Sequence, residues 1–129
     1  MTITQLIYTS QPFGFDDAML GGILVQARRN NPRDDITGCL ICRQDMYLQL
    51  LEGPEAAIDI LYEKIKQDDR HLAVAELCRA DVSARLFPDW AMRDDPAQSW
   101  LWPAEAVLAG VLFQATPDAL RAVFARVGT

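Results

Sequence analysis

The feature that most constrains the fold is a pair of apolar runs, at residues 36–43 and 46–53, separated by two polar residues. The runs read ITGCLICR and MYLQLLEG and are rich in β-branched and aliphatic side chains, which favour strands. A two-residue link joins antiparallel neighbours, so this stretch predicts a β-hairpin. Leu48, Leu50 and Leu51 would fill both faces of the sheet that contains it.

Strand and helix patterns alternate along most of the remaining chain. A helix beginning near Asp16 has apolar residues at helical spacing and ends at Asn30–Pro32. A second helix begins after Gly53 and Pro54 and closes at residues 68–71. Strands are predicted at residues 3–11, 36–43, 46–53, 74–83 and 87–94. The resulting order, βαββαββ, predicts an α+β fold with helices packed on a mixed sheet.

Two further helices are predicted at residues 103–114 and 116–127. Each has proline at or near its first position, and Thr116 is a good N-cap for the second. We expect this helical pair to cover an exposed face of the sheet.

Composition and charge argue against nucleic acids and membranes as binding partners of this chain. At 129 residues with 50% apolar side chains, the chain suits one domain with a substantial core. A formal net charge of -6 argues against direct nucleic-acid binding, which needs a cationic surface. The chain has no basic amphipathic stretch, no apolar run long enough to span a bilayer, and no signal-peptide pattern at its start. We therefore expect a cytoplasmic protein that does not bind membranes.

The three cysteines do not predict a metal or redox site. Cys39 and Cys42 form a C-x-x-C pattern, but on a strand, residues three apart point to opposite faces. The chain has one histidine, His71, to complete a metal site. We expect Cys39, Cys42 and Cys78 to be small apolar fillers in a reducing compartment, with no metal bound.

No catalytic motif is present either. The chain has no glycine-rich phosphate loop, nucleophile elbow or zinc-ligand spacing. Four Asp-Asp pairs fall at predicted element boundaries, where aspartate caps helices and stabilises turns: residues 16–17, 34–35, 68–69 and 94–95. We therefore expect a protein that is not an enzyme.

A few polar and aromatic residues remain to be explained. Gln49 lies in the middle of an apolar strand, where an unpaired amide would cost roughly 1–3 kcal/mol. Tyr8 ends the first strand, and Asn31 closes the first helix. Trp90 and Met92 lie two apart on the last predicted strand, hence on one face. Edge, cap and core roles explain each of the others taken singly, but Gln49 resists such an explanation most.

Together, these residues lie in five segments that resemble the blue-light-sensing flavin domains called BLUF: LIYTSQ, NNPRDDITGCLI, YLQLLEGP, IKQDDRH and FPDWAM. The resemblance runs from about Thr4 to Asp95, and the helical tail is similar to that of short, stand-alone members. It implies a ferredoxin-like βαββαββ sheet with two helices on one face and a flavin held between those helices. We expect residues 1–95 to form the flavin-binding photosensor core and 96–129 a helical extension packing on the sheet, with no output domain following.

The resemblance also implies roles for individual residues. Tyr8 matches the photoactive tyrosine that supplies an electron and a proton, and Gln49 matches the glutamine that switches hydrogen bonds. Trp90 and Met92 match the pair whose placement varies with signalling. Asn31 matches the hydrogen-bonding partner of the flavin's polar edge.

Seven residues match flavin-contacting positions of the family. Two of them are aliphatic residues that sandwich the ring, one from each helix, and two are polar residues near its pyrimidine end. The expected flavin-binding set is Tyr8, Ile23, Asn31, Gln49, Ile65, Arg70 and His71.

The function implied is that of a blue-light photoreceptor whose reversible, red-shifted state is read by a separate downstream protein. FAD is the flavin we expect, with FMN and riboflavin as alternatives, and a homodimer is left open. Two other functions compete with this one. A small flavin oxidoreductase would be reduced in the dark by NADH, and a ferredoxin-like interaction module would be colourless when purified.

Overall fold

The structure, a computed structural model, describes residues 3–12, 17–43, 45–68, 71–88, 92–96 and 101–127. In these ranges, five strands form one sheet in the order β4-β1-β3-β2-β5. The strands are β1 Ile3–Pro12, β2 Thr37–Arg43, β3 Met46–Gly53, β4 His71–Val82 and β5 Arg93–Pro96. Neighbours are antiparallel except β2 and β5, which run parallel, so the mixed α+β sheet is confirmed.

The predicted hairpin forms and lies inside the sheet. Strand β3 pairs with β1 on one side and with β2 on the other, and all of its residues are buried. Side chains alternate between the faces: Leu48 and Leu50 point to one apolar core, and Tyr47 and Leu51 point to the other. Gly38 allows the close approach of β2, because a Cβ there would lie 2.1 Å from the carbonyl oxygen of Leu50.

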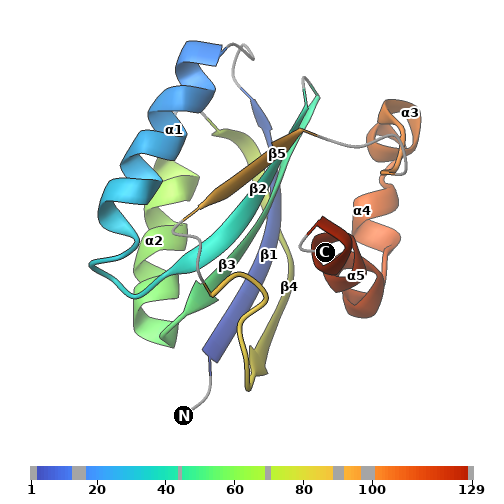
Figure 1. Ribbon diagram of the computed structural model, residues 1–129. Helices are drawn as coiled ribbons and strands as arrows, with labels where there is room; N and C mark the ends of the chain where they lie inside the picture. The colour runs from blue at the N-terminus through green and yellow to red at the C-terminus, as the bar shows by residue number, and fades with distance from the viewer. Residues whose placement is uncertain are drawn as a thin grey trace.

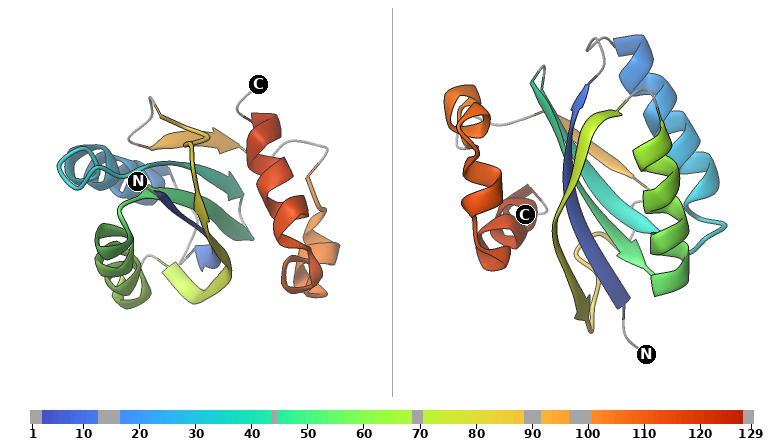
Figure 2. Two further views of the ribbon diagram at one scale, coloured as in Figure 1. Left: turned by 90° about the horizontal axis from the view of Figure 1, so that it is seen from below. Right: turned by 180° about the vertical axis from the view of Figure 1, so that it is seen from behind.

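Helices cover the two faces of this sheet (Figures 1 and 2). Helices α1 Asp17–Asn30 and α2 Glu55–Gln67 lie side by side on one face. The other face carries α3 Ala104–Leu108, α4 Val111–Gln114 and α5 Pro117–Val127. Within the described ranges, no helix is long and apolar enough to cross a membrane.

The C-terminal helices differ from the predicted pair in one respect. The helix expected at 103–114 is broken into α3 and α4 at Gly110, whose φ of 94° lies in the left-handed region that ends helices. Thr116 caps α5 as expected, its hydroxyl accepting a hydrogen bond from the backbone N–H of Ala119.

The last two strands begin at other residues than the sequence pattern indicates. Strand β4 begins three residues earlier, at His71, and β5 spans Arg93–Pro96 rather than 87–94. Met92 therefore lies just before β5 and not on it, while Trp90 falls outside the described residues. The pattern was misleading because residues 85–87 are held by hydrogen bonds to Glu52 of β3 rather than by a strand ladder of their own.

Two smaller expectations can also be checked. Asp94 and Asp95 lie inside β5, not at a boundary, so that part of the aspartate interpretation was wrong. Cys39 and Cys42 pack into the apolar cores on opposite sides of the sheet, as the strand geometry predicted.

Candidate functional site

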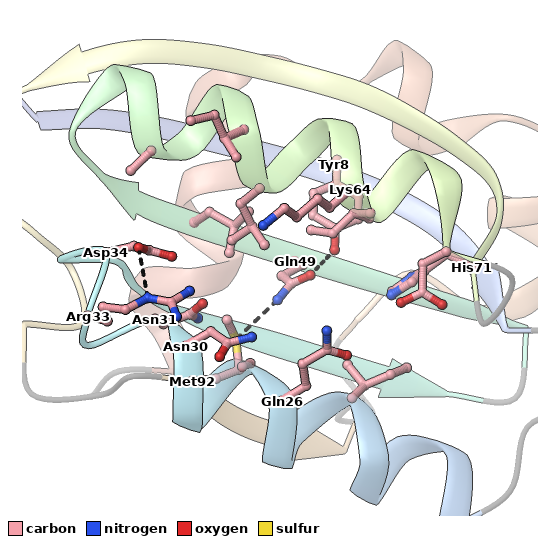
Figure 3. Close-up of a pocket in the computed structure, with 18 residues that line it drawn as sticks. Tyr8, Gln26, Asn30, Asn31, Arg33, Asp34, Gln49, Lys64, His71 and Met92 are labelled. Atoms are coloured by element: carbon pink, nitrogen blue, oxygen red, sulfur yellow. Dashed lines mark hydrogen bonds and ion pairs between the residues drawn. The ribbon is translucent and has the colours of Figure 1, made fainter.

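A cavity of about 390 Å³ lies between α1, α2 and the sheet (Figure 3). Its volume falls in the range of about 300–1,000 Å³ that is typical of small-molecule sites. Seven of the nine positions predicted to bind flavin or transmit its signal line this one cavity: Tyr8, Ile23, Asn31, Gln49, Ile65, His71 and Met92. The other two, Arg70 and Trp90, lie outside the described residues.

Tyr8, Gln49 and Met92 form a hydrogen-bonded row along the wall of the cavity formed by the sheet (Figure 3). The Tyr8 hydroxyl donates to Gln49 Oε1, and Gln49 Nε2 donates to Met92 Sδ at 3.2 Å. Tyr8 and Gln49 are direct cross-strand partners of β1 and β3, which brings together residues 41 positions apart. All three side chains are buried.

The partners of Gln49 explain how an amide is accommodated in this strand. A tyrosine hydroxyl can donate or accept, and a thioether is a weak acceptor. Neither partner therefore imposes one orientation on the amide strongly. Gln49 is satisfied in the arrangement observed, and the opposite orientation would still find a partner in the hydroxyl of Tyr8.

The phenol of Tyr8 is held in its neutral form. Burial raises its pKa well above the ordinary value of 10.0, and Tyr62 and Asp68 raise it further. The ring of Tyr62 lies against that of Tyr8, with centroids 5.5 Å apart. At neutral pH, Tyr8 therefore keeps its proton and can act as a hydrogen-bond donor.

Two aliphatic walls face each other across the cavity. Ile23 comes from α1 and Ile65 from α2, and small or apolar residues of both helices, including Ala27, Ala57 and Leu61, extend the walls. A space between two such helices suits a flat aromatic ring, whose faces are apolar.

Polar groups gather at the end of α1. Asn31 is buried, with 2% of its surface exposed, and lines the cavity. Its backbone carbonyl accepts from the N–H groups of Asp34 and Ile36, which fixes the turn after the helix. Asn31 thus has both a helix-terminal position and access to the cavity, and Arg33 and Asp34 of the same turn also line it (Figure 3).

His71 lies at the end of the cavity near β4. Its Nδ1 hydrogen-bonds the hydroxyl of Ser10 at 2.8 Å, and its ring packs edge-on against Tyr47. This contact holds the imidazole in place beside Tyr8, whose ring centroid is 6.3 Å away.

The sequence interpretation missed several polar lining residues. They include Gln26, Asn30, Lys64 and Asp68. Gln26 and Asn30 follow Ile23 by three and seven positions, and Lys64 and Asp68 follow the lining residue Leu61 by three and seven positions, so helical spacing would have found them.

The combined features fit a flavin ring. The cavity offers apolar walls for the faces of the ring, amides of Gln49 and Asn31 for its polar edge, and a neutral phenol beside them. The predicted flavin-binding residues that line the cavity and would hold the ring are Tyr8, Ile23, Asn31, Gln49, Ile65 and His71, and further polar residues of the two helices line the cavity with them.

Comparisons with known proteins point to one family. A family described as "Sensors of blue-light using FAD" matches residues 3–93. The beta subunit of a photoactivated adenylate cyclase from Euglena gracilis is 37% identical over 95 residues, which cover 70% of this chain and 11% of that protein. The chain thus spans about a tenth of the length of this relative.

Two further proteins extend the likeness. A blue light- and temperature-regulated antirepressor from Escherichia coli K12 is 41% identical over 61 residues, covering 47% of this chain and 15% of that protein. The dark-state structure of BlrB, a BLUF protein, superposes with a TM-score of 0.77 at 27% identity, covering 98% of this chain and 96% of that one. The superposition includes the C-terminal helices as well as the sheet.

Proposed function

The chain belongs to the BLUF family of blue-light sensors, and from that premise we propose that it is a photoreceptor in which Tyr8 and Gln49 form a light-driven hydrogen-bond switch. The observation that carries the proposal is the hydrogen-bonded row of Tyr8, Gln49 and Met92 along the wall of the cavity. This row places a phenol, a pivoting amide and the residue that directly precedes β5 in contact.

Tyr8 is the electron and proton donor in this proposal. A bound flavin supplies blue-light absorption and an excited state that is a strong one-electron oxidant. Tyr8 can give up one electron and its hydroxyl proton, because its phenol is neutral and hydrogen-bonded at the cavity wall. Both would return to Tyr8 once Gln49 has rearranged, so Tyr8 would end the cycle as the neutral phenol that it was at the start.

In this proposal, the light-induced state differs from the dark state in the hydrogen bonds that the amide of Gln49 makes. Rotation of its amide, or a change of its tautomer, exchanges what it offers to Tyr8 and to Met92. The new arrangement would strengthen a hydrogen bond to a carbonyl of the flavin ring and shift its absorption to longer wavelength. Because the two arrangements differ only in hydrogen bonds and, for the tautomer, in the position of one amide proton, the state can relax in the dark.

FAD is the flavin we propose, because the family that matches this chain is described as blue-light sensors that use FAD. FMN and riboflavin share the same ring and would make the same contacts with Tyr8, Gln49 and Asn31. Mass spectrometry of the cofactor released from purified protein would distinguish the three.

The output is proposed to be a change at the surface that a separate protein reads. Met92 is the residue through which a rearranged Gln49 would act. Its sulfur accepts a hydrogen bond from the amide of Gln49, and it lies directly before β5. We further propose that the chain itself catalyses no reaction and acts in the cytoplasm.

An absorption spectrum before and after blue light tests the function. We expect flavin-loaded protein to be yellow and to show a small red shift that reverses in the dark. Bleaching to reduced flavin, or reduction by NADH in the dark, would indicate an oxidoreductase instead. A colourless protein that takes up no added flavin would indicate an interaction module.

A further inference from the structure

A second polar network lies on the opposite face of the same two strands. Gln5 of β1 and Glu52 of β3 are direct cross-strand partners, three residues from the Tyr8–Gln49 pair on each strand. Glu52 is completely buried and Gln5 is 3% exposed, although they border the apolar core beneath the C-terminal helices.

Glu52 anchors the connection between β4 and β5. Its carboxylate accepts hydrogen bonds from the backbone N–H groups of Leu86 and Phe87, both at 2.8 Å, and from Gln5 Nε2 at 3.2 Å. A carboxylate buried this deeply is stable only while such donors remain in place. The position of residues 86–87 is therefore set by Glu52.

Gln5 carries the network to α5. Its Oε1 accepts a hydrogen bond from Arg121 Nε at 3.0 Å. Chemistry fixes the direction of this amide, because its N–H₂ group must face the carboxylate of Glu52 and its oxygen the guanidinium of Arg121. The amide of Gln5 thus has one orientation, in which it connects the carboxylate of Glu52 on β3 to the guanidinium of Arg121 on α5.

The network therefore links residues 86–87, in the connection between β4 and β5, with α5. Phe87 precedes Met92 by five residues, and Met92 accepts a hydrogen bond from the amide of Gln49. Arg121 lies on α5, which packs over the outer face of the sheet through Leu120 and Phe124.

We propose that Gln5 and Glu52 form the link through which a displacement of residues 86–87 reaches α5. Moving Leu86 and Phe87 would remove donors from a buried carboxylate, so Glu52 must follow them or lose hydrogen bonds. Either response changes the hydrogen bond between Gln5 and Glu52. Through Gln5, it also changes the hydrogen bond from Arg121 that connects α5 to the sheet. This inference rests on the proposed function, because light is what displaces the segment.

Hydrogen–deuterium exchange of flavin-loaded protein, in the dark and under blue light, tests the link. In the wild-type protein, we expect light to change exchange both in residues 84–96 and in α5. Gln5→Leu should keep the red shift and the change in residues 84–96 but lose the change in α5. Thr4→Val is the matched control, since it removes the part-buried hydrogen bond from Thr4, a buried residue of the same strand, to Asp81 and leaves the network intact.

Arg121→Met provides a second test that leaves both buried members of the network in place. It removes the final hydrogen bond from a side chain that is 29% exposed, so the fold should tolerate it. It should also abolish the light-dependent change in α5. A red shift without any change in α5 of the wild-type protein, or a change that survives both substitutions, would overturn the link. Absence of the red shift itself would instead overturn the proposed function.

Discussion

Strands β1 and β3 carry two polar cross-strand pairs, Tyr8–Gln49 on one face and Gln5–Glu52 on the other. Each pair includes a buried glutamine. Gln49 lies between a hydroxyl, which can donate or accept, and a weakly accepting sulfur. Gln5 lies between a carboxylate and a guanidinium, which are restricted to accepting and donating. The same side chain is thus free to reorient on one face and locked on the other.

Packing on the two faces differs in the same sense. The Tyr8–Gln49 face borders a cavity of about 390 Å³. On the opposite face, apolar side chains of β3 and α5, such as Leu48, Leu50 and Phe124, pack around the Gln5–Glu52 pair. Both glutamines are buried, so it is their partners, rather than their burial, that differ in how many orientations of the amide they permit.

The largest expected effect comes from replacing each glutamine with leucine. Gln49→Leu should keep the flavin but abolish the red-shifted state, because the amide that changes its hydrogen bonds is gone. Gln5→Leu should keep both. Light-minus-dark absorption spectra of the two variants provide the measurement. A normal photocycle in Gln49→Leu would contradict the switch, and loss of the red shift in Gln5→Leu would remove the distinction between the faces.

For the free energy of unfolding, we expect the larger loss from a substitution in the Gln5–Glu52 pair and the smaller loss from one in the Tyr8–Gln49 pair. Glu52→Gln should lower the free energy of unfolding by about 3 kcal/mol, because its N–H₂ group cannot accept from Leu86 or Phe87 and a charged acceptor is lost. Tyr8→Phe should cost about 1 kcal/mol, the worth of one neutral hydrogen bond. Urea unfolding of the two variants measures the difference.

A control separates burial from charge in that experiment. Asp118→Asn also removes a carboxylate, but this side chain is 99% exposed on α5. It should change stability by no more than about 0.5 kcal/mol. Equal losses in Glu52→Gln and Asp118→Asn would mean that the Glu52 network contributes little.

Cofactor affinity should depend on the cavity face alone. Asn31→Ala should weaken flavin binding about tenfold, since an unpaired polar group on the ring costs on the order of 1–3 kcal/mol. Gln5→Leu, on the opposite face of the sheet, should leave affinity unchanged. Titration of the apoprotein with flavin, followed by fluorescence, checks both. If Asn31→Ala binds as tightly as the wild type, Asn31 acts only at the end of α1.

The smallest effect concerns pH and is absent at neutrality. Because the pKa of Tyr8 is raised by burial, the folded protein retains a proton that the unfolded chain releases near pH 10.0. Stability from this group is complete below that pH and falls as the pH rises above it. The advantage of wild type over Tyr8→Phe should therefore shrink in alkaline solution, whereas Gln5→Leu should follow the slope of the wild type. Unfolding curves at several pH values would show a constant advantage if Tyr8 titrates normally.

Local patterns in the sequence predicted much of the fold and part of the site. The hairpin of β2 and β3 and the two helices that form the cavity follow from spacing and from turn residues such as Gly53 and Pro54. Gln49 was noticeable because an amide is unusual in an apolar strand. The start of β5 was predicted wrongly, because residues near Phe87 have strand-like composition but are held by Glu52 of another strand.

Local sequence patterns predict most of the strands and helices and which of their faces are apolar, because these depend on neighbours a few residues away. They also carry the family resemblance that singles out Tyr8 and Gln49. The meeting of Gln5, Glu52 and Arg121 follows from the tertiary structure alone, since their contacts join residues 47 and 116 positions apart. Such contacts depend on strand register and helix docking, which are set by the packing of the whole chain, and no local pattern encodes them.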